Sequence, residues 1–344
     1  QAPAREALGA RDVGGLVDAL LADGDVRRLL LDAAHRNGDV ARTIHLAAAT
    51  PGDRVATLRT ELDSLRTRRH LRYRESRAWA DDATIVVDEI ASTADSAPAR
   101  ELLKLVELAV GRVDKVIMYA DDSSGAIGDV ARRLLEIHEQ LGDAGVADPT
   151  ALAKWMIRFS FDDQDFFSPD PVRYADALGD CGLAVLRREV DQRMAAPDPD
   201  FAVRYVQERL AVLDGDVDRV VALLGGDLDR PYDFIRVAEA MLELDRVDDA
   251  LGWARRGIDS MSGWQVAQLY DIAAGVLADR GDDAGVLDLR REQHQRMPSS
   301  TTYAKLESAA SSSGAWPDEQ APAREALGAR DVGGLVDALL ADGD

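Results

Sequence analysis

A cluster of arginines forms the densest concentration of positive charge in the sequence. Six arginines fall at positions 66, 68, 69, 72, 74 and 77, with His70 and Tyr73 among them. Guanidinium groups bind phosphate and carboxylate through paired N–H donors, so this cluster could hold an anion or a nucleic acid. The positions do not keep to helical steps of three and four, and a solvated helix face is the alternative. Arg68, Arg69, Arg72 and Tyr73 are the candidate contact residues.

A second motif could bind an anion or a metal ion. Residues 121–129 read Asp-Asp-Ser-Ser-Gly-Ala-Ile-Gly-Asp, and glycines before a helix can expose N–H groups to an anion. A phosphate-binding loop requires Gly-Lys-Ser/Thr, and a calcium loop requires acidic or amide side chains at its third and fifth positions. Neither pattern is complete. The candidates Asp121, Asp122, Ser123, Ser124, Gly125 and Asp129 therefore form either an anion site or a turn that caps a helix.

No other residues are spaced for catalysis or for metal binding. The five histidines lie at 35, 45, 70, 138 and 294, and no pair has zinc-ligand spacing. The acidic stretch 214–218 continues into Arg219 and predicts a turn between helices. Cys181, at helical spacing from Leu178, is predicted to be a small core residue, and His138 to be partly buried. We expect a protein that is not an enzyme, with no cofactor and no metal; an enzyme that uses residues 121–129 is the rival.

Aromatic side chains gather between residues 155 and 174, although aromatics make up only 5% of the sequence. Such a cluster can line a recognition groove, or it can pack a loop onto neighbouring helices. The candidates for partner contact are Trp155, Phe159, Phe166 and Phe167.

Composition predicts an all-α fold. The chain has 344 residues, is 46% hydrophobic, and is rich in Ala, Leu, Arg, Glu and Asp. Only four lysines occur, at 104, 115, 154 and 305, which indicates GC-rich coding. The net charge of −22 disfavours nucleic acid and anionic membranes and favours neutral or basic partners. A single cysteine, no long apolar run and no signal peptide predict a cytoplasmic protein without a membrane span.

Apolar periodicity predicts helices along most of the chain. We expect one or two long helices over 53–92, further helices over 101–119, 129–141, 151–159 and 173–194, and an irregular stretch over 160–171. Residues 196–199, Ala-Pro-Asp-Pro, are the predicted boundary. Residues 1–195 would form an irregular helical region. Residues 200–310 would form hairpins at 201–224, 232–258 and 266–296 and a short helix at 301–310, followed by a loop over 311–317.

The second half of the chain contains an internal repeat. The sequence Asp-Arg-Val-Asp-Asp-Ala, which begins at Asp245, returns as Asp-Arg-Gly-Asp-Asp-Ala, which begins at Asp279. Ile235, Ala238, Ala240 and Leu242 then align with Leu269, Ile272, Ala274 and Val276. A period of about 34 residues with two helical stripes is typical of tetratricopeptide-like helical hairpins, which stack into a solenoid.

The two ends of the chain carry an identical segment, because residues 1–25 recur as residues 320–344. The copy is either an artefact of cloning or sequence registration, or the start of the second unit of a tandem protein with a period of 319 residues. The apolar residues Val332, Leu335, Val336, Leu339 and Leu340 predict an amphipathic terminal helix that could cap the array or mediate a homo-oligomer.

Several stretches resemble an uncharacterised helical domain of actinobacteria that stands alone or follows a SWIM-type zinc finger. They are Tyr119–Asp129, Arg72-Tyr-Arg74, Ala151–Trp155, Leu186–Val190 with Tyr174, Ala250–Arg256 and Pro298–Leu306. The zinc finger needs several cysteines, so the resemblance covers only the helical part, over about residues 1–317. It implies no catalytic residues.

These observations predict a non-enzymatic scaffold that binds a protein or a peptide. Two alternatives stay open: association with nucleic acid through residues 66–77, and self-assembly through the duplicated end helices.

Overall fold

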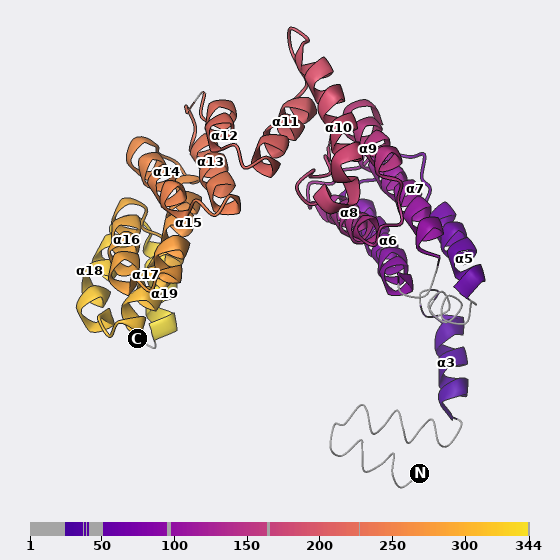
Figure 1. Ribbon diagram of the computed structural model, residues 1–344. Coiled ribbons are helices and arrows are strands. Elements are labelled where there is room, and N and C mark those ends of the chain that lie inside the picture. The colour runs from indigo at the N-terminus through magenta and orange to yellow at the C-terminus, as the bar shows by residue number, and fades with distance from the viewer. Residues whose placement is uncertain are drawn as a thin grey trace. The chain divides into compact units, whose positions relative to one another are not determined.

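The computed structural model describes residues 25–36, 38, 40, 51–94, 98–163, 166–226 and 228–342. Over these residues the fold is all-α, with sixteen α-helices, one π-helix and no strand (Figure 1). The chain divides into two compact units, Gln1–Val206 and Gln207–Asp344. The first copy of the duplicated segment, with the helix predicted there, lies outside the described residues apart from Asp25.

Among its described residues, the first unit contains seven α-helices, the start of an eighth and one π-helix. They are α3 (Asp25–Arg36), α5 (Pro51–Ser64), α6 (Tyr73–Thr93), α7 (Ala99–Ile117), α8 (Ala126–Asp143), α9 (Pro149–Arg158), the π-helix η1 (Phe159–Asp163), α10 (Ala175–Met194) and the start of α11 (Phe201–Leu213). Helices α5 to α10 supply most of its core. Helices α6 and α7 each pack against both α5 and α8, and α9 packs against α10.

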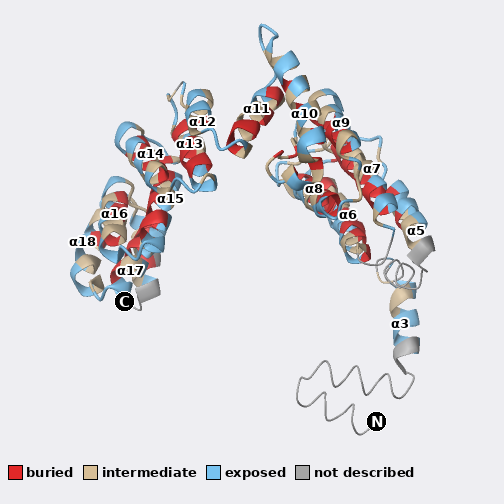
Figure 2. Cartoon of the chain, viewed as in Figure 1, coloured by how far each residue is buried: buried red, intermediate tan, exposed pale blue. Residues whose placement is uncertain are grey.

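Helix α7 confirms the clearest amphipathic pattern in the sequence. Leu102, Val106, Ala109 and Val113 step by three and four residues and are at most 4% exposed. Figure 2 shows buried residues on the faces where these helices meet and exposed residues on the outward faces. Each large aliphatic side chain buried in this way stabilises the fold by about 1.5–3 kcal/mol. The opposite side of α7 is more exposed and includes Lys104 and Lys115.

The predicted helical region 53–92 forms two helices, α5 and α6, separated by a connection at residues 65–72. Trp79 Nε1 donates a hydrogen bond to the Leu65 carbonyl at 2.8 Å, which anchors the start of this connection. At its end, Leu71 N donates to the Tyr119 carbonyl at 3.0 Å and Asp121 N donates to the Leu71 carbonyl at 2.8 Å. The structure therefore places the first four arginines of the cluster on a connection and not on a helix face.

The second unit is a series of helices that pack consecutively. They are the rest of α11, α12 (Val217–Leu224), α13 (Pro231–Glu243), α14 (Val247–Ser260), α15 (Val266–Asp279), α16 (Asp283–Arg296), α17 (Ser300–Ser312), α18 (Trp316–Gly328) and α19 (Val332–Asp342). Each helix from α12 onward contacts its successor, and α13 also contacts α15, α16 contacts α18 and α17 contacts α19. The expected loop at 311–317 is shorter, because Trp316 begins α18 and packs edge-on against Tyr303.

One turn geometry recurs between the helices of this unit. Gly215, Asp245, Gly281 and Gly314 all have positive φ, of 68°, 56°, 71° and 73°. In each turn, this residue and the next donate backbone hydrogen bonds to carbonyls at the end of the preceding helix, which is the usual left-handed end of a helix. Asp245 is the one non-glycine among them, and aspartate tolerates this conformation better than most residues.

These turns correct the register of the repeat. The structure aligns Asp245 with Gly281, and not with Asp279 as the matching letters suggested. In this register Phe234 aligns with Tyr270 and Met241 with Leu277, and all four side chains are buried. The Asp-Arg pair that begins at Asp245 recurs at Asp279, which indicated a shorter repeat than the backbone shows, because the left-handed conformation of Asp245 recurs at Gly281. The turns at 215, 245, 281 and 314 are unevenly spaced along the chain, so the period varies.

The copy at 320–344 forms two helices, α18 and α19, where the sequence predicted one. Within α19, Ala338 is buried, whereas Val332, Val336 and Leu340 are 68%, 50% and 69% exposed. Gly334 is also buried, and Leu335 packs against the core of the unit. Val332, Val336 and Leu340 form an exposed apolar stripe.

Replacement of Gly257 by alanine is expected to lower the free energy of unfolding of the second unit by about 1–3 kcal/mol, because the core has no room for a Cβ atom. A Cβ there would lie 2.6 Å from Leu269 Cδ1 and 2.8 Å from Phe234 Cβ. Gly252 on the same helix is the matched control, since a Cβ at that position meets no atom within 4 Å. Gly252→Ala should stabilise the helix. Chemical unfolding of both variants tests the prediction, and equal stabilities would contradict it.

No helix among the described residues is long and apolar enough to cross a membrane.

Candidate ligand-binding groove along helix α7

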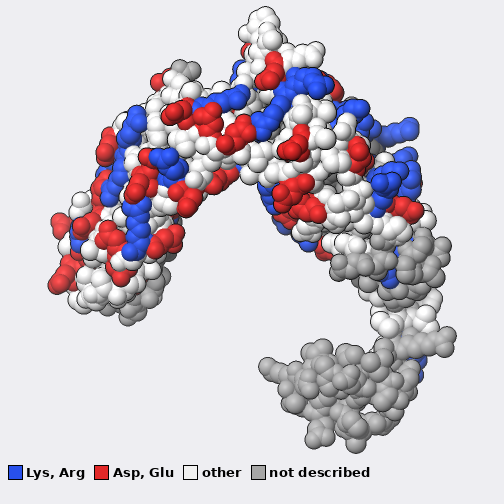
Figure 3. All heavy atoms as spheres, viewed as in Figure 1, with Lys and Arg blue, Asp and Glu red and all other residues white. Residues whose placement is uncertain are grey.

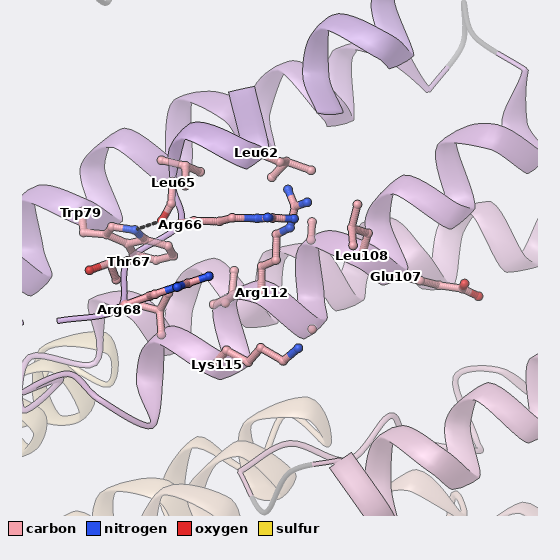
Figure 4. Close-up of a pocket in the computed structure, with 14 residues that line it drawn as sticks. Leu62, Leu65, Arg66, Thr67, Arg68, Trp79, Glu107, Leu108, Arg112 and Lys115 are labelled. Atoms are coloured by element: carbon pink, nitrogen blue, oxygen red, sulfur yellow. Dashed lines mark hydrogen bonds between the residues drawn. The ribbon is translucent and has the colours of Figure 1, made fainter. Parts of the chain in front are cut away.

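A cavity of about 500 Å³ lies between α5, the connection 65–72, α6 and α7 (Figure 4). Its walls combine apolar side chains with four cations: Leu62, Leu65 and Trp79 together with Arg66, Arg68, Arg112 and Lys115. An apolar floor rimmed by cations is suited to a ligand that has both an apolar group and a negative charge.

Two of these four cations are paired within the protein. Asp63 on α5 forms ion pairs with Arg112 and with Arg66, the latter at 3.0 Å, and Figure 4 shows the two guanidinium groups side by side. Burial lowers the pKa of Arg112, and the charge of Asp63 opposes this effect. Arg68 and Lys115 are exposed and form no ion pair with any described residue. These two cations are therefore the ones available to a ligand.

A second cavity of about 480 Å³ lies between α7 and α9. Its cations are Arg100 and Lys104 on α7, and Lys154 and Arg158 on α9. Arg158 Nε lies 3.4 Å from Asp163 Oδ2, whereas the other three form no ion pair in the described part of the chain. Figure 3 shows Lys and Arg atoms gathered over the region of α5 and α7 in the first unit, whereas acids and bases alternate over the second unit.

Glu107 lines both cavities, so they adjoin at this residue. Its side chain is 31% exposed, and Oε1 lies 3.8 Å from Nε2 of the fully buried His138. We call the two adjoining cavities together the α7 groove. Each cavity has cations, Glu107 lies where the two adjoin, and a second carboxylate, that of Asp148, lines the second cavity.

A buried histidine forms the layer beneath Glu107 and the second cavity. The His138 ring stacks on Trp155 with ring centroids 3.9 Å apart, and its Nδ1 lies 2.9 Å from Tyr174 Oη. Tyr174 Oη also lies 3.2 Å from the Leu135 carbonyl, which can accept its proton. Nε2 of His138 has no hydrogen-bond partner and faces Glu107. Burial lowers the pKa of His138, against the opposing effect of Glu107, and burial also raises the pKa of Tyr174.

We expect acid to destabilise the wild-type first unit more than a His138→Asn variant. Burial holds the pKa of His138 below its ordinary value of 6.5, so the unfolded chain takes up a proton that the folded chain does not. The stabilisation is complete above that ordinary value and is lost as the pH falls toward the folded-state pKa, by at most about 1.4 kcal/mol per pH unit. Asparagine keeps a polar group near the Nδ1 position without titrating. Unfolding curves measured at several pH values would contradict the prediction if both proteins changed in parallel.

Of the predicted arginine-cluster contacts, only Arg68 lines the groove. Arg69 pairs with Glu75 at 3.1 Å. Arg72 N donates to Glu75 Oε2 at 3.0 Å at the start of α6, and this hydrogen bond is the main reason that the pKa of Glu75 is lowered. Tyr73 follows as the first residue of α6 and is 43% exposed.

The motif at 121–129 is a turn that caps α8. Both Asp122 carboxylate oxygens accept backbone hydrogen bonds, from Ile127 N and Gly128 N, each at 2.9 Å. The Asp121 carboxylate accepts a hydrogen bond from Ser123 N at 3.2 Å, and its bonds to Ser123 lower its pKa. An anion would have to displace the Asp122 carboxylate from these N–H groups. The structure thus decides between the two interpretations in favour of the turn. The other three residues of the predicted set interact only with neighbours in this turn and the first turns of α8: Ser124, Gly125 and Asp129.

The predicted aromatic contact residues separate into two groups. Trp155 and Phe159 are 6% and 3% exposed and stack in parallel with centroids 5.3 Å apart. The prediction of Phe159 as a surface contact is therefore wrong. Trp155 packs against His138 of α8, but it also lines the second cavity of the α7 groove. Phe166 is 51% exposed, and its ring is tilted against Phe167.

The structure also corrects two predictions of side-chain burial. Cys181 is exposed and not a core residue, because Gly179 has φ of 49° and breaks the helical register between Leu178 and the cysteine. His138 is completely buried where the sequence predicted partial burial. Among the described residues, no group of three or more His, Cys, Asp or Glu side chains could hold a metal ion.

Sequence reasoning missed the lysines of the groove. Lys104, Lys115 and Lys154 line its two cavities, and they are three of only four lysines in the chain. Their rarity was visible in the sequence, but it was interpreted only as coding bias. Trp79 was missed as well, since nothing in its neighbourhood marked it as the wall of a cavity.

Comparisons with known proteins give this chain no relative: no family model, no curated protein and no solved structure matches it.

Proposed function

We propose that the protein is a non-enzymatic scaffold that binds an acidic segment of a partner protein in the α7 groove. The observation that carries this proposal is the unpaired cations Arg68 and Lys115 beside the apolar wall formed by Trp79. Aromatic and arginine side chains at a concave site provide most of the binding energy in many interfaces. Complementary charge adds specificity and speeds association. A leucine flanked by glutamates matches this combination.

The net charge of −22 does not prevent such binding. The charge of a whole protein is screened over about 8 Å at physiological ionic strength, so a ligand in the groove responds mainly to its nearest charges. Around the groove these are mostly cations. The preference for neutral or basic partners that follows from the sequence as a whole therefore does not extend to this site.

A scaffold role agrees with the second unit, which we propose is a tetratricopeptide-like solenoid. Its support is the consecutive packing of α12 to α19 and the recurring left-handed turns at 215, 245, 281 and 314. Arrays of this kind present surfaces to partners and stabilise themselves through contacts between neighbours. We place the protein in the cytoplasm on the evidence of its single cysteine.

Fluorescence anisotropy with a labelled peptide tests the proposed function. The probe carries leucine flanked by glutamates, and its control has glutamine at every glutamate. We expect saturable binding of the glutamate peptide that weakens as salt increases, and little binding of the control. Equal binding of both peptides, or no binding of either, would overturn the proposal.

Association with nucleic acid is the second proposal, and different residues would carry it. Arg74 and Arg77 are exposed on α6, form no ion pair with described residues and do not line the groove. A duplex that spans the arginine cluster would use them, whereas a peptide in the groove would not. Arg74→Glu with Arg77→Glu should therefore weaken a salt-dependent shift of DNA and leave peptide binding unchanged.

Self-assembly is the third proposal, and the exposed stripe on α19 favours it. Light scattering over a range of concentrations should reveal oligomers that dissociate when Val336 and Leu340 are both changed to aspartate. A monomer at every concentration would remove this proposal.

A further inference from the structure

The two ends of the α7 groove are joined by one stripe of the helix. Lys104, Leu108, Gly111 and Lys115 follow one another by four, three and four residues, which is the spacing of a single helix face. At 100° per residue, Lys104 and Lys115 differ by only about 20° around the helix axis. Along the axis they are about 16 Å apart, at 1.5 Å per residue.

At each end of this stripe, a cation on a second element lines the same cavity as the lysine. Lys154 on α9 shares the second cavity with Lys104, and Arg68 on the connection shares the first cavity with Lys115. None of these four cations pairs with an acid among the described residues. Asp148 also lines the second cavity, where its carboxylate caps α9 by accepting a hydrogen bond from Ala151 N at 2.8 Å. The cations of the groove thus offer two separate positions for a negative group.

Glu107 places a negative charge between these two positions. The residue lines both cavities and is part-exposed, with the buried His138 ring behind it. Burial lowers the pKa of His138 and so disfavours the charged imidazolium that would neutralise the carboxylate. An acidic ligand residue at this level would be repelled, whereas a neutral or basic one would be accepted.

Gly111 lies in the middle of the stripe and has no steric role within the protein. A Cβ at this position would meet no atom within 4 Å. Glycine inside a helix is destabilising relative to alanine, and crowding does not require it here. The open space above Gly111 allows the backbone of a ligand to approach the helix between the two cationic ends.

We infer that the α7 groove recognises an extended peptide with two acidic groups about five residues apart and a neutral or basic residue between them, since an extended chain advances about 3.3 Å per residue. This inference rests on the proposed function and specifies its ligand. The acidic groups could be carboxylates or phosphates, which share the chemistry of paired oxygen acceptors. Two anchors on one chain reinforce each other most strongly when the spacing between them matches the distance between the two binding positions.

A peptide series tests the spacing. The probes are labelled peptides with two glutamates separated by increasing lengths of serine and alanine, and one peptide with a single glutamate. We expect affinity to peak near a separation of about five residues, about tenfold above the single-glutamate peptide and above the shortest and longest members. Phosphoserine at either anchor distinguishes phosphate from carboxylate as the preferred group.

Two variants test the middle of the groove. Gly111→Leu should weaken the best peptide about tenfold without lowering the melting temperature, because the new side chain occupies the ligand's space and not the protein's. Glu107→Gln should remove the discrimination between peptides with central lysine and central glutamate. Gly252→Leu on α14 is the matched control for the leucine substitution, as Gly252 is also uncrowded and does not line the groove.

The outcomes separate this inference from the function on which it rests. If all acidic peptides bind equally at every spacing, the protein binds acidic segments, but the two-anchor inference is wrong. If Gly111→Leu binds the best peptide as well as the wild type does, the ligand does not run along α7 over Gly111, and the inference also fails. If no peptide in the series binds, the proposed function itself fails.

Discussion

The Trp155→Ala variant is expected to lose about 3–5 kcal/mol of the free energy of unfolding of the first unit. The indole is 6% exposed and lies between the His138 ring at 3.9 Å and the Phe159 ring at 5.3 Å, measured between ring centroids. Its removal would leave a cavity and open His138 to water. Chemical unfolding followed by the fluorescence of the remaining tryptophans and by circular dichroism measures the loss.

Phe166→Ala provides the matched control for this prediction. This ring is 51% exposed and lies in the same aromatic stretch of the sequence, so its loss should change the stability by no more than about 1 kcal/mol. The pair decides whether the aromatic stretch belongs to the core or to a recognition surface. Similar losses for both variants would contradict the division into buried and exposed rings.

The double change Arg68→Glu and Lys115→Glu is expected to weaken binding of the glutamate peptide about 100-fold or more. Two attractive interactions become repulsive, and near a protein surface each unit charge contributes on the order of 1–4 kcal/mol at 4 Å. Both side chains are exposed and without ion pairs among the described residues, so the melting temperature should stay unchanged. Titration by anisotropy at low and at physiological salt measures the effect.

Arg74→Glu with Arg77→Glu is the control for the charge reversal, because it changes the net charge equally and touches only residues outside the groove. This control should bind the peptide as the wild type does. If both double variants lost binding to the same extent, the attraction would come from the overall field of the arginine cluster, and the α7 groove would not be the site.

The helices of this protein could be predicted from sequence, because the apolar spacing that indicates a helix lies within one segment of the chain. The stripe Leu102, Val106, Ala109 and Val113 can be recognised within a single helix, and all four residues are buried. The capping turn at Asp122 could be named as one of two interpretations, since aspartate before a helix commonly accepts from its first N–H groups. The choice between them required the positions of Ile127 N and Gly128 N.

Errors arose where one residue changed the backbone path. Gly179 has positive φ and separates Cys181 from the buried face that its spacing predicted. Asp245 adopts the left-handed conformation that glycine has in the neighbouring turns, which moves its partner in the repeat from Asp279 to Gly281. Sequence spacing assumes a continuous helix, so it fails at such residues.

By itself, the sequence determined the all-α fold, the amphipathic face of α7 and the excess of negative charge, because each follows from composition or from periodicity within one segment. Only the tertiary structure decided that Arg68, Trp79 and Lys115 meet at one cavity, that Lys104 and Lys154 meet at another, and that Glu107 stands between the two. These residues come from different helices and from the connection between α5 and α6. Their proximity depends on how the helices pack. The buried faces of the helices determine that packing, and their sequence does not reveal which exposed residues of different helices will lie close together.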